Sequence, residues 1–118
     1  MPVLTEKPVF RVDNTDLDAQ ATTNSYVDVS GSNVDTLRYK SLSFVVGNTD
    51  EANDLDFKVL ASNDGTNYVE VQAEATVQEL TGGTYAVTQA AYRYYKVQVK
   101  STIAETPAEA TVSYSLKQ

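Results

Sequence analysis

The sequence lacks the residues on which most enzyme and metal chemistry depends. Its 118 residues include no cysteine, no histidine and no tryptophan. Without cysteine there is no disulfide framework, no thiolate zinc site and no cysteine nucleophile. Without histidine the commonest general base, the commonest metal ligand and every histidine-containing catalytic triad are missing. No glycine-rich phosphate loop or nucleophile elbow replaces them. We therefore expect no enzymatic activity and no cofactor.

Positive charge is also scarce. Nine Lys and Arg face 16 Asp and Glu, which gives a formal net charge of −7. No basic stripe is present to neutralise phosphates, so we expect neither a nucleic acid nor an anionic membrane as partner. Residues 1–56 carry ten acids and four bases (−6), whereas residues 57–118 carry six and five (−1). This imbalance predicts a distinctly acidic surface region, which serves either solubility or a partner with a basic face.

Long hydrophobic runs are absent as well. No apolar run exceeds three residues, so the sequence predicts neither a transmembrane helix nor a signal peptide. We expect the chain to be made in a host cytoplasm and to leave it only as part of a particle.

What the sequence does contain favours β-strands. Val, Thr, Tyr, Phe and Ile make up 42 of the 118 residues. Apolar and polar residues alternate with period two in four segments, which are 38–47, 55–61, 92–100 and 111–117. In the second of these, Asp56 and Lys58 are predicted to face outward. Such alternation is typical of half-buried antiparallel strands.

Weaker strand patterns fill the intervals between these segments. They cover residues 9–12, 25–29, 68–72, 75–79 and 84–88, and turn residues such as Gly65 and the pair Gly82–Gly83 separate or begin them. Eight or nine short strands in one chain predict an all-β fold, an antiparallel two-sheet β-sandwich of the jelly-roll type. A closed barrel is the alternative, and residues 89–91 could form a single helical turn.

The N-terminal residues carry little strand pattern. Two of the chain's three prolines lie within residues 1–8. We expect residues 1–8 to form an extended arm, either frayed or lying on a neighbouring subunit, and residues 9–118 to form a single sandwich domain. The residues expected to make the contact with a partner are Pro2, Val3, Leu4, Pro8, Val9 and Phe10.

Two acidic segments invite comparison with calcium sites. Residues 13–18 fail the EF-hand pattern, because Asp18 stands at its glycine position and Asn24 at its glutamate position. Asp50, Asp54 and Asp56 form a second cluster, which we keep only as weak candidates for Ca²⁺ ligands.

Tyrosines offer the remaining candidate site. Sugar-binding sandwiches stack pyranose rings on exposed aromatic faces. The residues that could form such a patch here are Asp64, Tyr68, Tyr92 and Tyr94. Packing within the fold is the alternative role for each tyrosine.

Two segments of the sequence resemble known proteins. The run Phe57-Lys58-Val59-Leu60-Ala61-Ser62-Asn63-Asp64-Gly65-Thr66-Asn67-Tyr68 is similar to a strand–hairpin–strand of discoidin-like, galactose-binding-like sandwiches. The run Ala91-Tyr92-Arg93-Tyr94-Tyr95-Lys96-Val97-Gln98-Val99 resembles a later strand of that fold. On a short acidic chain without tryptophan, both segments also resemble small β-sandwich virion proteins of tailed bacteriophages, either head decoration proteins or tail-associated proteins.

These resemblances imply a function in a viral particle. We expect a non-catalytic structural protein of the virion, a capsid decoration or cement protein that binds the major capsid protein or another virion protein. It would act as a homo-oligomer, with a trimer favoured. The alternative is a carbohydrate-binding or host-adhesion module of a tail or cell-surface assembly. The discoidin-like resemblance transfers no ligand residue, because that family usually has flanking cysteines and exposed loop aromatics that bind the ligand, and this chain has neither cysteine nor tryptophan.

Overall fold

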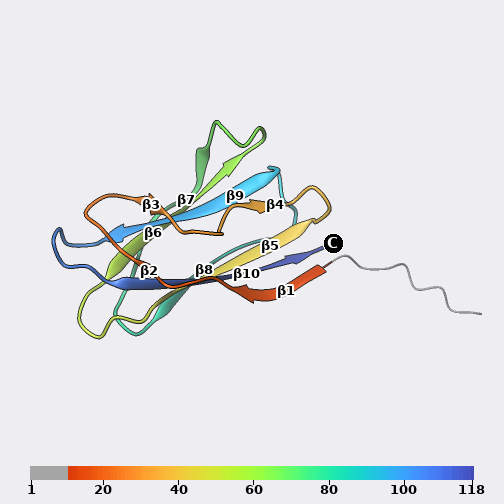
Figure 1. Ribbon diagram of the computed structural model, residues 1–118. Coiled ribbons are helices and arrows are strands. Elements are labelled where there is room, and N and C mark those ends of the chain that lie inside the picture. Colours follow the sequence, from red (N-terminus) through yellow and green to blue (C-terminus); the bar gives the residue numbers. More distant parts are fainter. Residues whose placement is uncertain (1–10) are drawn as a thin grey trace, which may run out of the picture.

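The computed structural model describes residues 11–118, which fold into ten β-strands and no helix (Figure 1). The strands are β1 (Arg11–Asp16), β2 (Gln20–Ala21), β3 (Val27–Asp28), β4 (Val34–Asp35), β5 (Ser41–Asn48), β6 (Leu55–Ser62), β7 (Val69–Val77), β8 (Gly82–Val87), β9 (Tyr94–Ser101) and β10 (Glu109–Lys117). Residues 11–118 therefore contain no helix that is long and apolar enough to cross a membrane.

The strands form two antiparallel sheets of five strands each, packed face to face. Sheet A has the order β1-β10-β5-β8, and β2 also pairs with β10. Sheet B has the order β3-β9-β6-β7, and β4 also pairs with β9. Because β1 and β2 share one edge of β10, and β3 and β4 share one edge of β9, the ten strands occupy eight positions. This order is that of a jelly roll, so the predicted sandwich is confirmed and the barrel alternative is not.

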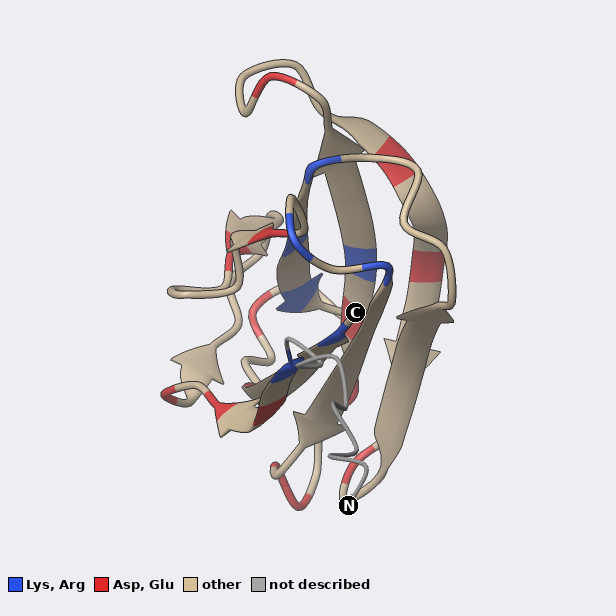
Figure 2. Cartoon of the chain, turned by 90° about the vertical axis from the view of Figure 1, so that its right-hand side faces the viewer, with Lys and Arg blue, Asp and Glu red and all other residues tan. Residues whose placement is uncertain are grey.

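The loops leave the sandwich at two ends. At the end that we name the C-terminal end lie loops 36–40, 63–68 and 88–93, the start of β1 and the end of β10. At the opposite end, named the far end, lie loops 22–26, 49–54, 78–81 and 102–108. Figure 2 looks onto the C-terminal end.

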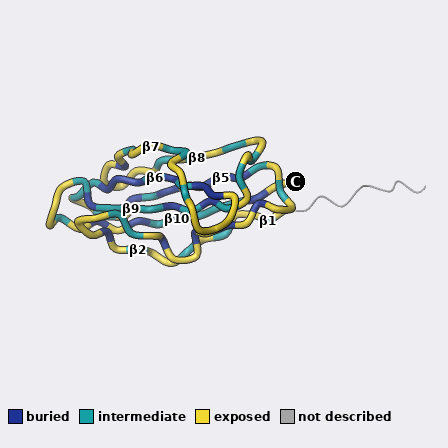
Figure 3. Tube along the Cα trace, turned by 90° about the horizontal axis from the view of Figure 1, so that it is seen from above, coloured by how far each residue is buried: buried dark blue, intermediate teal, exposed yellow. Residues whose placement is uncertain are grey.

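The core lies between the sheets and follows the period-two pattern. Phe44, Val46 and Val112 of sheet A meet Phe57 and Val97 of sheet B, and all five are nearly or fully buried. Figure 3 shows buried and more exposed positions alternating along these strands. Within residues 11–118 every buried polar side-chain atom has a hydrogen-bond partner.

The strand predictions succeed where alternation is strong. The four strongest segments correspond to β5, β6, β9 and β10. The two segments predicted at 68–72 and 75–79 are one continuous strand, β7, because no turn interrupts residues 73 and 74. The helical turn predicted at residues 89–91 is wrong, since a bend without helix links β8 to β9. The predicted arm, residues 1–8, lies outside the described residues.

Candidate interaction surfaces

Asp64 belongs to the β6–β7 hairpin and holds its turn together. Its carboxylate accepts hydrogen bonds from the backbone N–H groups of Asn67 and Thr66, each at 2.8 Å. The Asn67 amide and the Ser62 hydroxyl donate to it as well, also at 2.8 Å. The donors of Asn67 and Thr66 hold the pKa of Asp64 well below its usual range. Most of the acceptor capacity of Asp64 is thus used within the turn.

Tyr68 and Tyr94 both lie at this hairpin. The Asn33 side-chain amide donates to the Tyr68 hydroxyl at 3.2 Å, and the Lys96 ammonium lies 4.2 Å from the centre of the Tyr68 ring. The ring of Tyr94 lies against Gly65, close enough that a Cβ there would be 3.4 Å away. The hairpin of Asp64 therefore brings three of the four predicted patch residues to one end of sheet B.

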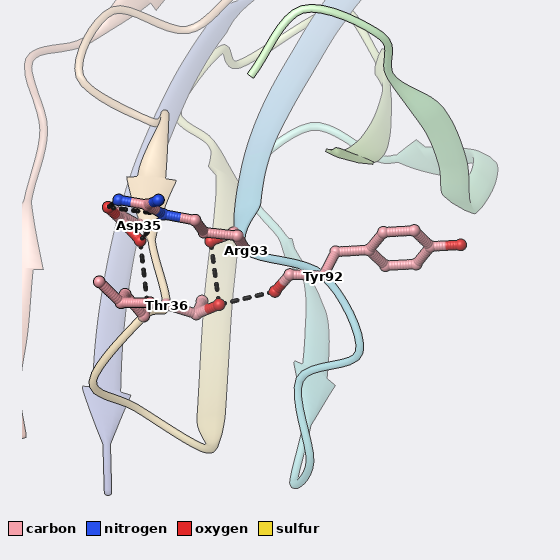
Figure 4. A network of polar contacts seen from close by, with 5 residues as sticks. Asp35, Thr36, Tyr92 and Arg93 are labelled. Carbon is pink, nitrogen blue, oxygen red and sulfur yellow. Dashed lines mark hydrogen bonds and ion pairs between the residues drawn. The ribbon is translucent and has the colours of Figure 1, made fainter. Parts of the chain in front are cut away.

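Tyr92 does not join them. Its ring packs edge to face against the buried Tyr95, with ring centres 6.3 Å apart, and it contacts the core. Figure 4 shows the Tyr92 ring pointing away from the side chains of Asp35 and Arg93. The predicted four-residue patch is therefore divided, because residue 92 precedes β9 and does not follow the alternation of that strand.

An ion pair lies beside Tyr92, at the start of β9. The Arg93 guanidinium binds both carboxylate oxygens of Asp35, with its shortest contact at 2.9 Å. The Thr36 hydroxyl lies within 2.7 Å of the Tyr92 carbonyl and 2.9 Å of the Arg93 carbonyl (Figure 4). The hydrogen bond from Arg93 lowers the pKa of Asp35. Together these contacts fix β4 to the start of β9 and leave the Arg93 side chain outside the core.

The three candidate calcium ligands each bind protein donors. Asp50 accepts from the backbone N–H groups of residues 52 and 53, and Asp54 accepts from that of residue 79. Asp56 faces outward as predicted, yet it is buried, because Thr76 and Thr102 cover it and donate to its carboxylate at 2.8 Å. In the described part of the chain no three acidic side chains lie close enough together to hold a metal ion.

The outer face of sheet B carries a network that the sequence reasoning missed. The Tyr26 hydroxyl donates to Glu74 at 2.6 Å, and the ammonium groups of Lys58 and Lys100 lie 4.3 Å and 5.4 Å from the centre of the Tyr26 ring. Lys58 pairs with Glu70, and Lys100 with Glu74. Burial and the Glu74 contact raise the pKa of Tyr26 far above its usual range. The signal was present in the outward lysines of β6 and β9, but their partners lie on other strands.

The outer face of sheet A has the opposite character. Across β5, β8 and β10 its outward positions carry only small uncharged side chains, except for Glu109 and Lys117 at the two ends of β10. We name this surface the small-residue face: Ser41, Ser43, Val45, Gly47, Thr84, Ala86, Thr111, Ser113 and Ser115. A shallow hollow of about 500 Å³ lies over one end of sheet A, between the first residues of β1 and the last residues of β8. The alternating serines of β5 and β10 were the sequence signal for this face. Only the structure shows the register in which the two strands pair.

Of the predicted contact residues in the arm, none lies in the described part of the chain. Pro2, Val3, Leu4, Pro8, Val9 and Phe10 all precede Arg11, the first residue described. Their role stays a prediction.

Comparison with known proteins places the chain by fold and by family. The SPBc2 prophage-derived protein YomS shares the fold with a TM-score of 0.60 at 9% identity, and the match covers 98% of this chain and 100% of that one. A protein from disulfide-linked pili, described as Bacillus endospore appendages, has a TM-score of 0.56 at 11% identity, with 98% and 94% covered. At such identities the likeness shows the fold alone.

No curated protein matches the sequence. A family match extends from residue 35, the last residue of β4, to residue 118, and so includes every strand from β5 to β10. The chain therefore belongs to the family described as a domain of unknown function, DUF6385.

Proposed function

We propose that the chain is a non-catalytic structural subunit of a phage particle, which decorates the outer face of the assembled head. It packs side by side as a homo-oligomer, with a trimer favoured, and it binds the major capsid protein. The jelly-roll fold shared with a prophage-derived protein and with a pilus protein supports a role in assembly. A chain without histidine or cysteine fits a role that needs no catalysis.

The small-residue face is the observation that carries this proposal. Four of the five ion pairs between described residues lie away from it, on sheet B and the loop that precedes β9, and the fifth lies in β1. A surface without charge loses little solvation when a second copy covers it, whereas the charged face of sheet B would lose much more. Its small side chains also allow two sheets to approach closely. Val45, 43% exposed at the centre of this face, supplies apolar area for the contact.

The N-terminal arm supplies the contact with the shell in this proposal. Arg11 pairs with Lys117, so residues 1–10 join the sandwich at its C-terminal end, beside the hollow on sheet A. Ten residues can reach at most about 33–36 Å. Pro2, Val3 and Leu4 near the start of the segment offer apolar area to a capsid subunit. Binding the assembled shell but not its free subunits stabilises the shell by mass action, by about 2.7 kcal/mol for each site at a concentration 100 times Kd.

The location of the protein tests this function directly. Immunogold electron microscopy of particles from the source culture should label heads evenly. A second preparation should carry Val45→Lys, which puts a charge on the small-residue face, and its matched control is Val69→Lys, at a position 50% exposed on β7. We expect Val45→Lys to dissociate the oligomer and reduce head labelling, while Val69→Lys leaves both unchanged. Label at the tail tip, or on no particle, would contradict decoration.

The alternative function, a carbohydrate-binding or host-adhesion module, rests on the hairpin. Asp64, Tyr68 and Tyr94 lie near one another at the C-terminal end, although Tyr92 does not. A glycan array would detect this activity. Binding that is lost in Tyr68→Ala and Tyr94→Ala, and kept in Tyr92→Phe, would favour adhesion over decoration.

A further inference from the structure

The far end of the sandwich is acidic. Its four loops and the adjoining first residue of β10 carry six carboxylates and no lysine or arginine. These acids are Asp50, Glu51, Asp54, Glu79, Glu105 and Glu109. None of them forms an ion pair with a residue of the described chain, because the described ion pairs all involve other acids. Their charge is therefore not neutralised within residues 11–118.

The C-terminal end is basic. Figure 2 shows lysine and arginine positions gathered around the C-terminus. Arg38, Lys40 and Lys117 lie at this end and form no ion pair among residues 11–118. Arg11 and Arg93 lie there too, and each is paired, with Asp13 and Asp35 respectively. The three unpaired bases make this end the positive counterpart of the far end.

Exposed aliphatic side chains lie at both ends. Leu80 and Ile103, each 67% exposed, belong to far-end loops, and Leu37, 68% exposed, belongs to the loop before β5. They are the three most exposed large hydrophobic residues of the described chain. Leu80 also has a φ of 56°, a left-handed conformation that is unfavourable for a bulky side chain. The far end thus combines exposed aliphatic area with negative charge. The C-terminal end combines it with three unpaired bases and one unpaired carboxylate, Asp64, which accepts hydrogen bonds within its own turn.

We propose that copies of this chain associate end to end, the far end of one copy docking on the C-terminal end of the next. The contact pairs Glu51 and Glu79 with Arg38 and Lys40 of the following copy, and Leu80 with its Leu37. The proposal rests on the structural role proposed above and adds a second, longitudinal contact to it. Because the two surfaces differ, the contact is heterologous, and repetition gives a row of subunits unless the rotation closes a ring.

Charge also explains why a second copy is the occupant. A chain with net charge −7 repels its copies when they approach in most orientations. The end-to-end orientation brings unlike charges together and separates the two acidic ends. Electrostatic complementarity of this kind selects orientation and partner more than it adds affinity. The aliphatic side chains at both ends then supply apolar area that is covered in the contact.

Self-association of the purified chain tests the proposal without any particle. Sedimentation velocity should show growth beyond the side-by-side oligomer at low salt. The apparent Kd of that growth should rise at least about tenfold between about 0.1 M and 1 M salt, since the Debye length falls from about 10 Å to about 3 Å. Leu80→Ser should weaken the growth as well. Growth that is absent, or independent of salt, would overturn the proposal.

Charge exchange identifies the two surfaces. Glu51→Lys/Glu79→Lys places lysines opposite Arg38 and Lys40 of the next copy. Arg38→Glu/Lys40→Glu places glutamates opposite Glu51 and Glu79, so neither variant should grow alone. A mixture of the two should grow, because residues 51 and 79 of one variant can then meet residues 38 and 40 of the other with opposite charge. The control Asp16→Lys/Asp18→Lys makes the same change in net charge as the first variant, at exposed residues outside the loops of both ends, and it should grow like the unchanged chain.

A mixture that stays unassembled would overturn the end-to-end contact, and so would growth of either variant alone. If the acidic far end binds only a basic surface of the capsid, the mixture should stay unassembled while the heads are still labelled evenly. Failure of this inference is thus distinguishable from failure of the proposed function, which is judged by location on the particle.

Discussion

Adjacent glycines at the start of β8 should respond oppositely to the same substitution. Gly82 pairs with Gly47, and Gly83 pairs with Val46. An added Cβ at Gly83 would lie 3.0 Å from the Phe57 ring and 3.4 Å from a Val77 methyl group. At Gly82 the nearest atom is the Val46 carbonyl oxygen at 3.5 Å, an ordinary contact. Alternation along the strand therefore puts one new methyl group into the core and the other outside it.

The magnitude follows from two opposing effects. Replacing glycine by alanine restricts the unfolded chain and stabilises a compatible site by about 0.4–1 kcal/mol. Overpacking a core with an extra methyl group costs about 1–3 kcal/mol, and Phe57, only 2% exposed, has little room to move. Gly82→Ala should therefore stabilise by about 0.4–1 kcal/mol. Gly83→Ala should destabilise by about 0.5–2 kcal/mol.

Urea unfolding measures both changes. With a slope of about 2 kcal/mol per M, the midpoint of Gly83→Ala should fall by about 0.3–1 M at unchanged slope. Phe57→Leu should lower the free energy of unfolding less in the Gly83→Ala background than in the original chain, and the difference, which is the coupling energy, should be at least about 0.5 kcal/mol. Equal midpoints for the two glycine variants, or a higher one for Gly83→Ala, would refute the assigned direction of these residues.

Three further predictions concern the surfaces. Burial and Glu74 favour the neutral form of Tyr26 and raise its pKa in the folded chain, so its contribution to stability is present below the ordinary tyrosine pKa of 10.0 and is lost as pH rises beyond it. Between pH 8 and 11, the free energy of unfolding measured in urea should therefore fall less for Tyr26→Phe than for the original chain. Equal falls would contradict this reasoning. EDTA should leave the Tm unchanged because Asp50, Asp54 and Asp56 bind protein donors; a fall in Tm would restore the calcium hypothesis. Deleting residues 2–9 should preserve the far-UV circular dichroism and the Tm while weakening binding to heads, and undiminished binding would remove the arm from the mechanism.

The sequence predicted the direction of side chains correctly wherever burial alone decides it. Leu42, Phe44 and Val46 of β5 face the core as their alternation predicts. It failed for β2 and β4, which contain two residues each and exist because they pair with β10 and β9. Two residues cannot show a period, so only the partner strand defines such an element.

Long-range contacts explain the failures at the candidate sites. Tyr92 turns toward the core at a point where the Thr36 hydroxyl donates to the Tyr92 carbonyl and Asp35 binds the Arg93 guanidinium, both from more than 50 residues away in sequence. Asp56 is buried because Thr102, from the loop after β9, covers an outward position of β6. Neither contact leaves a trace in the local pattern, since both partners are ordinary polar residues.

The charge asymmetry shows how the fold reorganises a property that the sequence displays along its length. The net charge is −6 in residues 1–56 and −1 in residues 57–118. In a jelly roll, however, successive loops alternate between the two ends, so Asp50 and Glu51 from the first half meet Glu79 and Glu105 from the second at the far end. The basic residues Arg38 and Lys117, from opposite halves, meet at the other end for the same reason. The division that matters for assembly is thus between the two ends of the sandwich rather than between the two halves of the sequence. It follows once the consecutive strands β5, β6 and β7 are known to alternate in direction between those ends.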